Sequence, residues 1–198
     1  MPLEVSKKIR YEAVVVGASA GGLAALSQVL SALPGDFPLP VAVVLHLGPD
    51  SDNFAARHLA ADCALPVKEA EEKEGISGGT VYMAPPGYHL LVEEERTFSL
   101  STEEPVIFSR PAIDPLFETA AEAFCEGLVG VILTGASPDG ARGLSRVKAL
   151  GGLAVVQSAE SAEAKEMPRA AMAAVAVDHV LDLAGIGPFL RRLAKREI

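Results

Sequence analysis

The sequence predicts one α/β domain built on a doubly wound, mostly parallel sheet flanked by helices, and three observations support this fold class. Its 198 residues match the usual size of a single domain. Between residues 12 and 196, short apolar or β-branched runs alternate with longer segments of helical spacing, as in parallel sheets joined by helices. Most of the short runs lack the alternation of a half-solvated strand, so we expect strands that are buried on both faces.

The short runs define the expected strands, which in chain order are 13–16, 41–46, 80–84, 89–93, 128–134, 153–157 and 179–181. The segments of helical spacing between them define the expected helices, which are 22–33, 53–63, 115–125, 141–150, 168–174 and 188–195. We expect residues 1–11 to form an N-terminal tail and residues 12–198 to form the domain.

Local signals support several of these helices. Asp114 would cap the helix at 115–125 and Pro115 would open it, after which one apolar stripe faces the core (Leu116, Phe117, Ala120 and Phe124). Gly151 and Gly152 would end the helix at 141–150 in the left-handed conformation. The basic residues from Arg191 onward suit the C-terminus of the last helix.

The middle of the chain, residues 67–111, has a different rhythm. Glycine and proline divide it into short runs, at Gly75, Gly78, Gly79 and the Pro85–Pro86–Gly87 triplet. This spacing is typical of hairpins and surface loops, so an antiparallel hairpin or edge is expected there. The acidic runs 69–74 and 93–95 leave two interpretations open, a solvated face and a partner surface.

Composition excludes several classes of protein. With 49% hydrophobic and 22% charged residues and a mean hydropathy of +0.30, the chain has enough apolar surface to fold and is not disordered. Its apolar runs stop well short of the ~20 residues that a membrane span needs. No secretory signal is visible at the N-terminus, so a soluble, cytoplasmic protein is expected.

Charge and cysteine content narrow the function further. The net charge of −9 and the pI near 4.9 would repel phosphate backbones, so no nucleic-acid partner is expected. Cys63 and Cys125 lie far apart without CxxC spacing, which argues against a disulfide framework and a zinc site.

A candidate nucleophile lies in the first strand-to-helix turn. Gly17, Ser19 and Gly21 match GxSxG in this context, where small neighbours allow a tight turn and the helix start offers N–H groups to an oxyanion. An anion-binding turn of the Rossmann kind is the alternative. GxGxxG would require glycine in place of Ser19, and a P-loop would require a Lys that is absent here, but the turn alone does not decide between these interpretations.

Two further polar residues follow buried strands. Taken alone, His46 could be a structural histidine and Asp139 a helix N-cap. However, the carboxyl ends of parallel strands meet at one edge of a sheet, so Ser19, His46 and Asp139 can converge. They would then form a catalytic triad, with Ser19 as the nucleophile, His46 as the general base and Asp139 as the residue that orients the imidazole. Its Ser, His, Asp order differs from that of α/β-hydrolases, so GxSxG does not place the chain in that family.

Six motifs resemble one known family in sequence and in order. They are GASAGG, VVLHLGP, APPGYHLLV, SRPAIDPLFETAA, GVILTGASPDGARGL and VVQSAESAEAKEMPRAA. Over residues 12–193 the chain resembles the catalytic domain of CheB, the chemotaxis protein-glutamate methylesterase. The resemblance implies a serine hydrolase that removes γ-methyl esters from glutamates on the cytoplasmic helices of methyl-accepting chemoreceptors, and that also deamidates glutamine.

The resemblance also implies site residues and partners. Ser19, His46 and Asp139 match the family's catalytic residues, with no metal or organic cofactor. Main-chain N–H groups near Ala20 and Ala136 would bind the oxyanion, and His89 either contacts substrate or is structural. Chemoreceptor helices are the expected partner, together with a separate response regulator or scaffold, since the tail is too short for the receiver domain that members commonly carry.

Two departures from the family keep alternatives open. Members usually carry Thr after the nucleophile and Met three residues before the aspartate, where this chain has Ala20 and Ala136. If these changes ruin the site, the chain would be a catalytically silent partner-binding module. A Rossmann-like nucleotide binder is a further alternative. His58 and His179 are expected to be structural, whereas Arg110 and Arg142 could either attract an acidic surface or be solvated charges.

Overall fold

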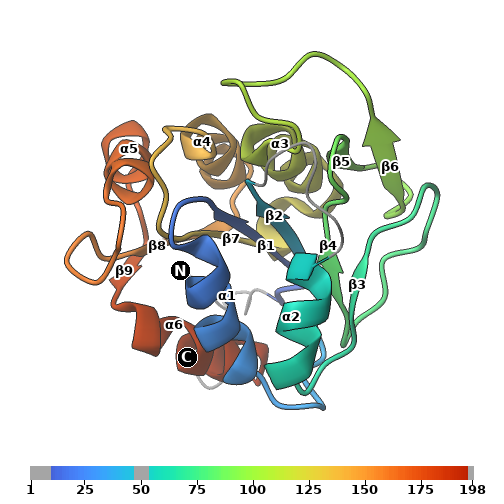
Figure 1. Ribbon diagram of the computed structural model, residues 1–198, viewed down its shortest axis with the longest axis horizontal. Coiled ribbons are helices and arrows are strands. Elements are labelled where there is room, and N and C mark those ends of the chain that lie inside the picture. The colour runs from blue at the N-terminus through green and yellow to red at the C-terminus, as the bar shows by residue number, and fades with distance from the viewer. Residues whose placement is uncertain (1–9, 47–53, 196–198) are drawn as a thin grey trace, which may run out of the picture.

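The computed structural model describes residues 10–46 and 54–195, and its centre is a parallel sheet (Figure 1). Seven strands lie in the order β3-β4-β2-β1-β7-β8-β9, and every neighbouring pair is parallel. Their bounds are Ala13–Ala18 (β1), Val41–Leu45 (β2), Val67–Glu69 (β3), Val81–Met83 (β4), Leu128–Ile132 (β7), Leu153–Gln157 (β8) and His179–Leu181 (β9). The expected mostly parallel sheet is confirmed.

Helices cover both faces of this sheet. One face packs against α1 (Gly22–Ser31), α2 (Phe54–Asp62) and α6 (Leu183–Ala194), and the other against α3 (Ile113–Phe124), α4 (Ala141–Ala149) and α5 (Glu166–Ala174). A 3₁₀ turn, η1 (Cys125–Gly127), follows α3. In β1, Val14 and Val16 join the first core while Val15 joins the second, because successive side chains of a strand point to opposite faces. The doubly wound arrangement is therefore confirmed.

The middle segment contains the expected antiparallel hairpin. Its strands are β5 (His89–Val92) and β6 (Phe98–Ser101), which pair with each other and not with the main sheet. Two strands of the middle segment were not expected from the sequence, namely β6 in this hairpin and β3 in the main sheet. β3 is a half-buried VKE segment at the sheet edge, and its pairing with β4 is a tertiary contact that no local pattern announces.

Three helix starts differ from the expectation, and the first is that of α5, which begins at Glu166 and not at Pro168. Helix α3 begins at Ile113 after Ala112, so Asp114 lies inside its first turn and the prediction that Asp114 caps this helix is wrong. Helix α6 begins at Leu183 and contains Pro188, which had been expected to open it. By contrast, Gly151 follows α4 with φ 88°, as predicted, whereas Gly152 does not adopt the left-handed conformation that was expected of it. Asn53 and the tail residues 1–9 lie outside the described residues.

Candidate active site

The three residues predicted to form a triad follow three neighbouring strands of the sheet. Ser19 comes directly after β1, His46 directly after β2, and Asp139 lies in the connection from β7 to α4. Because β1 lies between β2 and β7, the carboxyl ends of these parallel strands place all three residues at one edge.

His46 and Asp139 are in direct contact. Nε2 of His46 lies 2.8 Å from Oδ2 of Asp139, and the Asp139 side chain is fully buried while that of His46 is 10% exposed. The imidazole therefore donates its Nε2 proton to the carboxylate, which leaves Nδ1 as the nitrogen that can accept a proton. The backbone N–H of His46 also donates to Ala18, which anchors the residue to the end of β1.

The Asp139 carboxylate also caps helix α3. It accepts the backbone N–H groups of Ile113 at 2.6 Å and Asp114 at 3.0 Å. Burial is the largest single influence and tends to raise the pKa of Asp139. The hydrogen bonds from His46, Ile113 and Asp114 together outweigh it and hold this pKa below its ordinary value. Asp139 is therefore a carboxylate near neutral pH, and it both caps a helix and orients His46.

Asp114 caps helix α4 in the same way as Asp139 caps α3. One oxygen of its buried carboxylate accepts the N–H groups of Gly140 at 2.9 Å and Gly143 at 2.7 Å. Burial is the main reason why the pKa of Asp114 is raised. Asp139, which precedes α4, thus caps α3, and Asp114, in the first turn of α3, caps α4. These reciprocal hydrogen bonds hold Asp139 in place.

Ser19 lies in the turn that joins β1 to α1. Its N–H donates to the Thr134 carbonyl at 2.9 Å, its carbonyl accepts from Gly22 at 2.7 Å, and Gly21 adopts the left-handed conformation with φ 73°. Ser19 and His46 line the same cavity of about 390 Å³. No hydrogen bond joins their side chains, so in this structure the His46–Asp139 pair is formed and Ser19 lies beside it.

Thr134 and Gln157 support this turn, and sequence reasoning had assigned them no role. The Thr134 hydroxyl donates to the Ala20 carbonyl at 2.9 Å and accepts the N–H of Ala164 at 2.8 Å. Gln157, fully buried, accepts the N–H of Thr134. Both residues could have been found in the sequence by the criterion that singled out His46, since each is a polar residue at the end of a buried strand.

The main-chain donors predicted for the oxyanion are available. Within the described part of the chain, neither the N–H of Ala20 nor that of Ala136 has a hydrogen-bond partner. Both alanine side chains are exposed, so this surface is open where a larger residue would cover it.

The other candidate histidines and arginines have mostly local partners. Nε2 of His89 donates to the Glu104 carbonyl, and its Nδ1 accepts the N–H of Ala112. These contacts and its burial favour the structural interpretation, while a substrate contact by His89 stays a prediction. His58 lines the cavity beside Ser19.

Both arginines that were considered for attracting an acidic surface contact oxygen atoms of this chain. Arg142 pairs with Glu118 at 2.5 Å, and Arg110 donates to the carbonyls of Thr102 and Glu103. Local pairing is the clearest role of Arg142, whose Nε and Nη2 both donate to Glu118. In Arg110 only Nη1 donates, and within the described residues its buried Nε has no hydrogen-bond partner.

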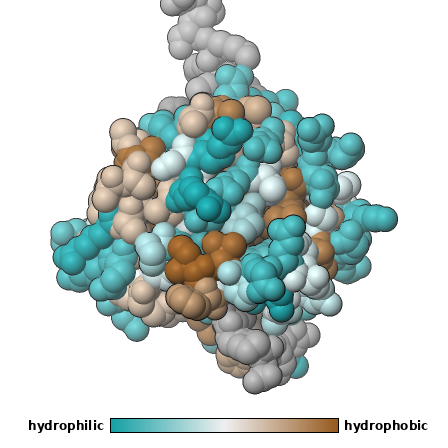
Figure 2. Space-filling view, turned by 90° about the horizontal axis from the view of Figure 1, so that it is seen from above, coloured by the Kyte–Doolittle hydropathy of each residue, from teal (hydrophilic) through white to brown (hydrophobic). Residues whose placement is uncertain are grey.

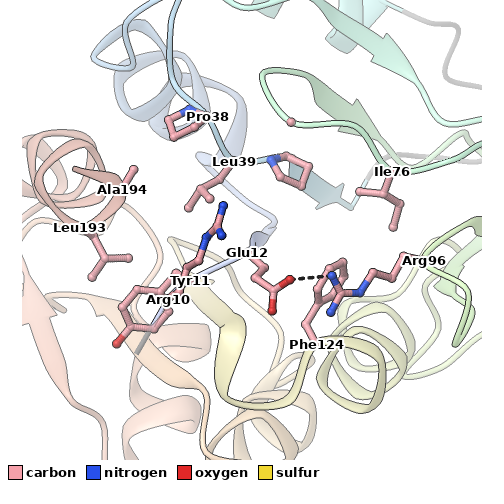
Figure 3. Close-up of a pocket in the computed structure, with 12 residues that line it drawn as sticks. Arg10, Tyr11, Glu12, Pro38, Leu39, Ile76, Arg96, Phe124, Leu193 and Ala194 are labelled. Atoms are coloured by element: carbon pink, nitrogen blue, oxygen red, sulfur yellow. Dashed lines mark hydrogen bonds and ion pairs between the residues drawn. The ribbon is translucent and has the colours of Figure 1, made fainter. Parts of the chain in front are cut away.

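A second, larger cavity of about 470 Å³ lies at the opposite edge of the sheet (Figure 3). Glu12 and Pro40, which line it, directly precede β1 and β2. Arg96 also lines this cavity. Its guanidinium group lies 2.6 Å from the Glu12 carboxylate, and its Cζ lies 4.7 Å from the centre of the Phe124 ring. None of the predicted catalytic residues lies there, so its size does not make it the active site.

Neither a membrane span nor a metal cluster is found in the described residues. No helix within 10–46 and 54–195 is long and apolar enough to cross a bilayer. The same residues contain no group of three or more metal-ligating side chains.

Comparisons with known proteins agree on one family. A sequence model described as "CheB methylesterase" matches residues 14–190. A protein of Leptospira interrogans named "Putative protein-glutamate methylesterase/protein-glutamine glutaminase" is 50% identical over 190 residues, which cover 96% of this chain and 98% of that protein. A "Protein-glutamate methylesterase/protein-glutamine glutaminase 2" of Anaeromyxobacter dehalogenans is 40% identical, and the match covers 96% of this chain but 55% of that longer protein.

A solved structure shows the same fold. The crystal structure of the Thermotoga maritima CheB methylesterase catalytic domain matches with a TM-score of 0.89 and 33% identity, over 93% of this chain and 100% of that one.

Proposed function

Because the chain belongs to the CheB methylesterase family, we propose that Ser19, His46 and Asp139 are its catalytic residues and that its substrate is a glutamate γ-methyl ester on a chemoreceptor helix. The observation that carries this proposal is the 2.8 Å contact between His46 and a buried, ionised Asp139, at the edge of the cavity that Ser19 also lines. A CheB-type methylesterase is a serine hydrolase, and this pair supplies the base that a serine needs.

The reaction takes place in two acyl-transfer steps. Nδ1 of His46 accepts the proton of the Ser19 hydroxyl as its oxygen attacks the ester carbonyl carbon. The imidazolium then gives this proton to the leaving methoxide, so that methanol departs and an acyl-serine remains. Next, His46 deprotonates a water molecule that attacks the acyl carbon. As the acyl bond breaks, the imidazolium gives this proton to the Ser19 oxygen, and the product acid loses a proton to solvent to become the glutamate carboxylate. With a glutamine substrate, ammonia leaves in place of methanol.

Asp139 and two main-chain donors stabilise the charges that develop. The carboxylate of Asp139 balances the imidazolium and holds the ring with Nδ1 directed away from itself. The N–H groups of Ala20 and Ala136 would receive the oxyanion, and one such donor is typically worth about 3 kcal/mol in kcat. Since these donors belong to the backbone, alanine at both positions preserves them.

The relatives' names give the substrate group, a protein glutamate ester or glutamine, and the partners follow from the family resemblance alone. We place the reaction on the cytoplasmic helices of methyl-accepting chemoreceptors, with a separate response regulator or scaffold as a further partner. The chain spans almost the whole Leptospira relative but about half of the longer ones, at 55% for the Anaeromyxobacter protein.

The test is release of methanol from methyl-labelled chemoreceptor cytoplasmic fragments. Ser19→Ala should lower kcat by on the order of 10⁵, since triad members act as a unit. Ser31→Ala, which removes an exposed hydroxyl at the end of α1, is the matched control and should leave kcat unchanged. A Ser19→Ala protein within tenfold of the wild type would overturn the assignment, and no release from several receptors would favour a silent partner-binding module.

A further inference from the structure

Large apolar side chains are exposed mainly at the catalytic edge of the sheet. The described residues contain five of them, namely Phe54 at 55%, Tyr88 at 41%, Ile107 at 42%, Phe108 at 100% and Val180 at 49% exposure. Phe54 opens α2 after β2, Tyr88 follows β4, and Ile107 and Phe108 lie just before α3, whose N-terminus holds Asp139. Val180, within strand β9, is the exception. An apolar side chain that is exposed beside a candidate site is a candidate contact for a partner.

Ile107 and Phe108 form the tip of a tight turn. Val106 and Ser109 exchange two backbone hydrogen bonds, at 3.1 and 2.9 Å, across the two residues between them. Both of these residues have positive φ, at 48° and 64°, a conformation that Asn and Gly adopt with ease and that a β-branched residue avoids. Since the Phe108 ring is fully exposed, folding gains nothing from it. Both residues are therefore costly to the fold, which suggests a use outside it.

The base of this loop is held firmly. His89, from β5, contacts the backbone on both sides of the turn, at the Glu104 carbonyl and the Ala112 N–H. Arg110 donates to the carbonyls of Thr102 and Glu103. In Figure 1 the connection from β6 to α3 stands out at the top of the molecule. Figure 2, which looks down on this side, shows apolar patches separated by hydrophilic surface.

We infer that the Ile107–Phe108 turn is a docking contact for a helix of the protein substrate, one that carries an apolar stripe beside its esterified glutamate. This inference rests on the proposed function. Phe108 is not part of the cavity lined by Ser19, so a small ester in that cavity does not need it, whereas a helix that extends beyond the cavity offers further side chains that could contact it. The chain has a net charge of −9, so long-range attraction to a glutamate-rich surface cannot supply the affinity, and apolar contact can.

The test replaces the turn by the residues that its backbone prefers, as Ile107→Asn/Phe108→Gly. This variant removes both apolar side chains and relieves the strained backbone, so its melting temperature should equal or exceed that of the wild type. With a methylated chemoreceptor cytoplasmic fragment, KM should rise about tenfold while kcat stays within twofold. Val180→Asn, which removes an exposed apolar side chain from β9, is the matched control and should change neither constant.

Two further measurements separate this inference from the proposed function. Labelling of Ser19 by a small fluorophosphonate reports the catalytic residues without docking, and its rate should be the same in the wild type and the turn variant. Binding of the receptor fragment to Ser19→Ala protein, with and without the turn substitutions, reports docking without turnover, and the substitutions should weaken it about tenfold. An unchanged KM and Kd would overturn the docking role even if methanol is released. If no methanol is released, the proposed function fails and the binding comparison alone decides about docking.

Discussion

Asp139 and Asp114 each accept two backbone N–H groups from a helix start, and burial tends to raise the pKa of both, yet their pKa values shift in opposite directions. The pKa of Asp139 is lowered, because the hydrogen bonds that it accepts outweigh burial, and that of Asp114 is raised, mainly by burial. Ionisation of Asp139 therefore stabilises the fold at pH above the ordinary carboxyl value, and this contribution is lost as pH falls through its lowered pKa. For Asp114, the favourable contribution is present below the ordinary value and is lost as pH rises through the raised pKa.

Two asparagine variants test these signs. Between about pH 3 and pH 7, the free energy of unfolding lost by Asp139→Asn should grow with pH, whereas that lost by Asp114→Asn should shrink. Urea denaturation of both variants and the wild type at several pH values measures this. If the loss of unfolding free energy changed with pH in the same direction in both variants, the two pKa shifts would not have opposite signs.

Thr134 makes a second prediction for a single side chain. Thr134→Val keeps the shape of the residue but leaves the Ala20 carbonyl and the Ala164 N–H without their partner, at a cost of about 1–3 kcal/mol in stability. Because Ala20 follows the proposed nucleophile, Ser19, kcat for methanol release should also fall, by about tenfold or more.

Thr119→Val is the matched control for this effect. The Thr119 hydroxyl also links two elements, accepting the N–H of Val92 and donating to Pro115, but on the hairpin side of α3. It should lose stability without a fall in kcat. Equal kcat losses in both variants would mean that Thr134 acts through general stability and not by positioning Ser19.

At the scale of elements, the turn after β7 is packed against the turn after β1. A Cβ added at Gly135 would lie 2.6 Å from Cε of Met167 and 2.9 Å from Cβ of Ser19. The end of Met167 can move aside, but Cβ of Ser19 is fixed to the backbone. Gly135→Ala should therefore displace Ser19 and lower kcat at least about tenfold, for a stability loss of about 1–3 kcal/mol.

Gly75→Ala provides the comparison, since nothing lies within 4 Å of a Cβ at that position. Steady-state methanol release and thermal unfolding of both variants measure the effect. An unchanged kcat in a folded Gly135→Ala protein would show that the turn can accommodate the added Cβ without displacing Ser19.

Elements with a strong local pattern could be predicted from the sequence, and elements defined by tertiary contacts could not. Strand β8 was expected with the correct bounds because its apolar run is buried on both faces. Strand β3 lacks such a run and exists through its pairing with β4. The capping role of Asp114 was assigned to the wrong helix because an N-cap motif in the sequence cannot show a partner that lies near Gly140.

At the scale of the whole molecule, the sheet topology made the candidate site predictable. Residues that follow neighbouring parallel strands converge whatever their distance in the chain, which is how Ser19, His46 and Asp139 could be grouped. The residues that hold this group, such as Thr134, depend on hydrogen-bond geometry between turns, which the strand order does not specify. Topology thus predicts which residues meet, and packing determines how each is held.

The overall charge leads to a last prediction, about salt. The chain has a net charge of −9, and each turnover converts a neutral ester into a carboxylate, so the product is repelled more than the substrate. Added salt screens this repulsion, so the demethylated fragment should inhibit more strongly, with its inhibition constant falling several-fold between about 20 and 150 mM NaCl, while kcat/KM for the methylated fragment should not fall. Labelling of Ser19 by a neutral fluorophosphonate should not change over the same range. A fall in kcat/KM with salt would mean that attraction between opposite charges, and not apolar contact, brings the substrate to this edge of the sheet.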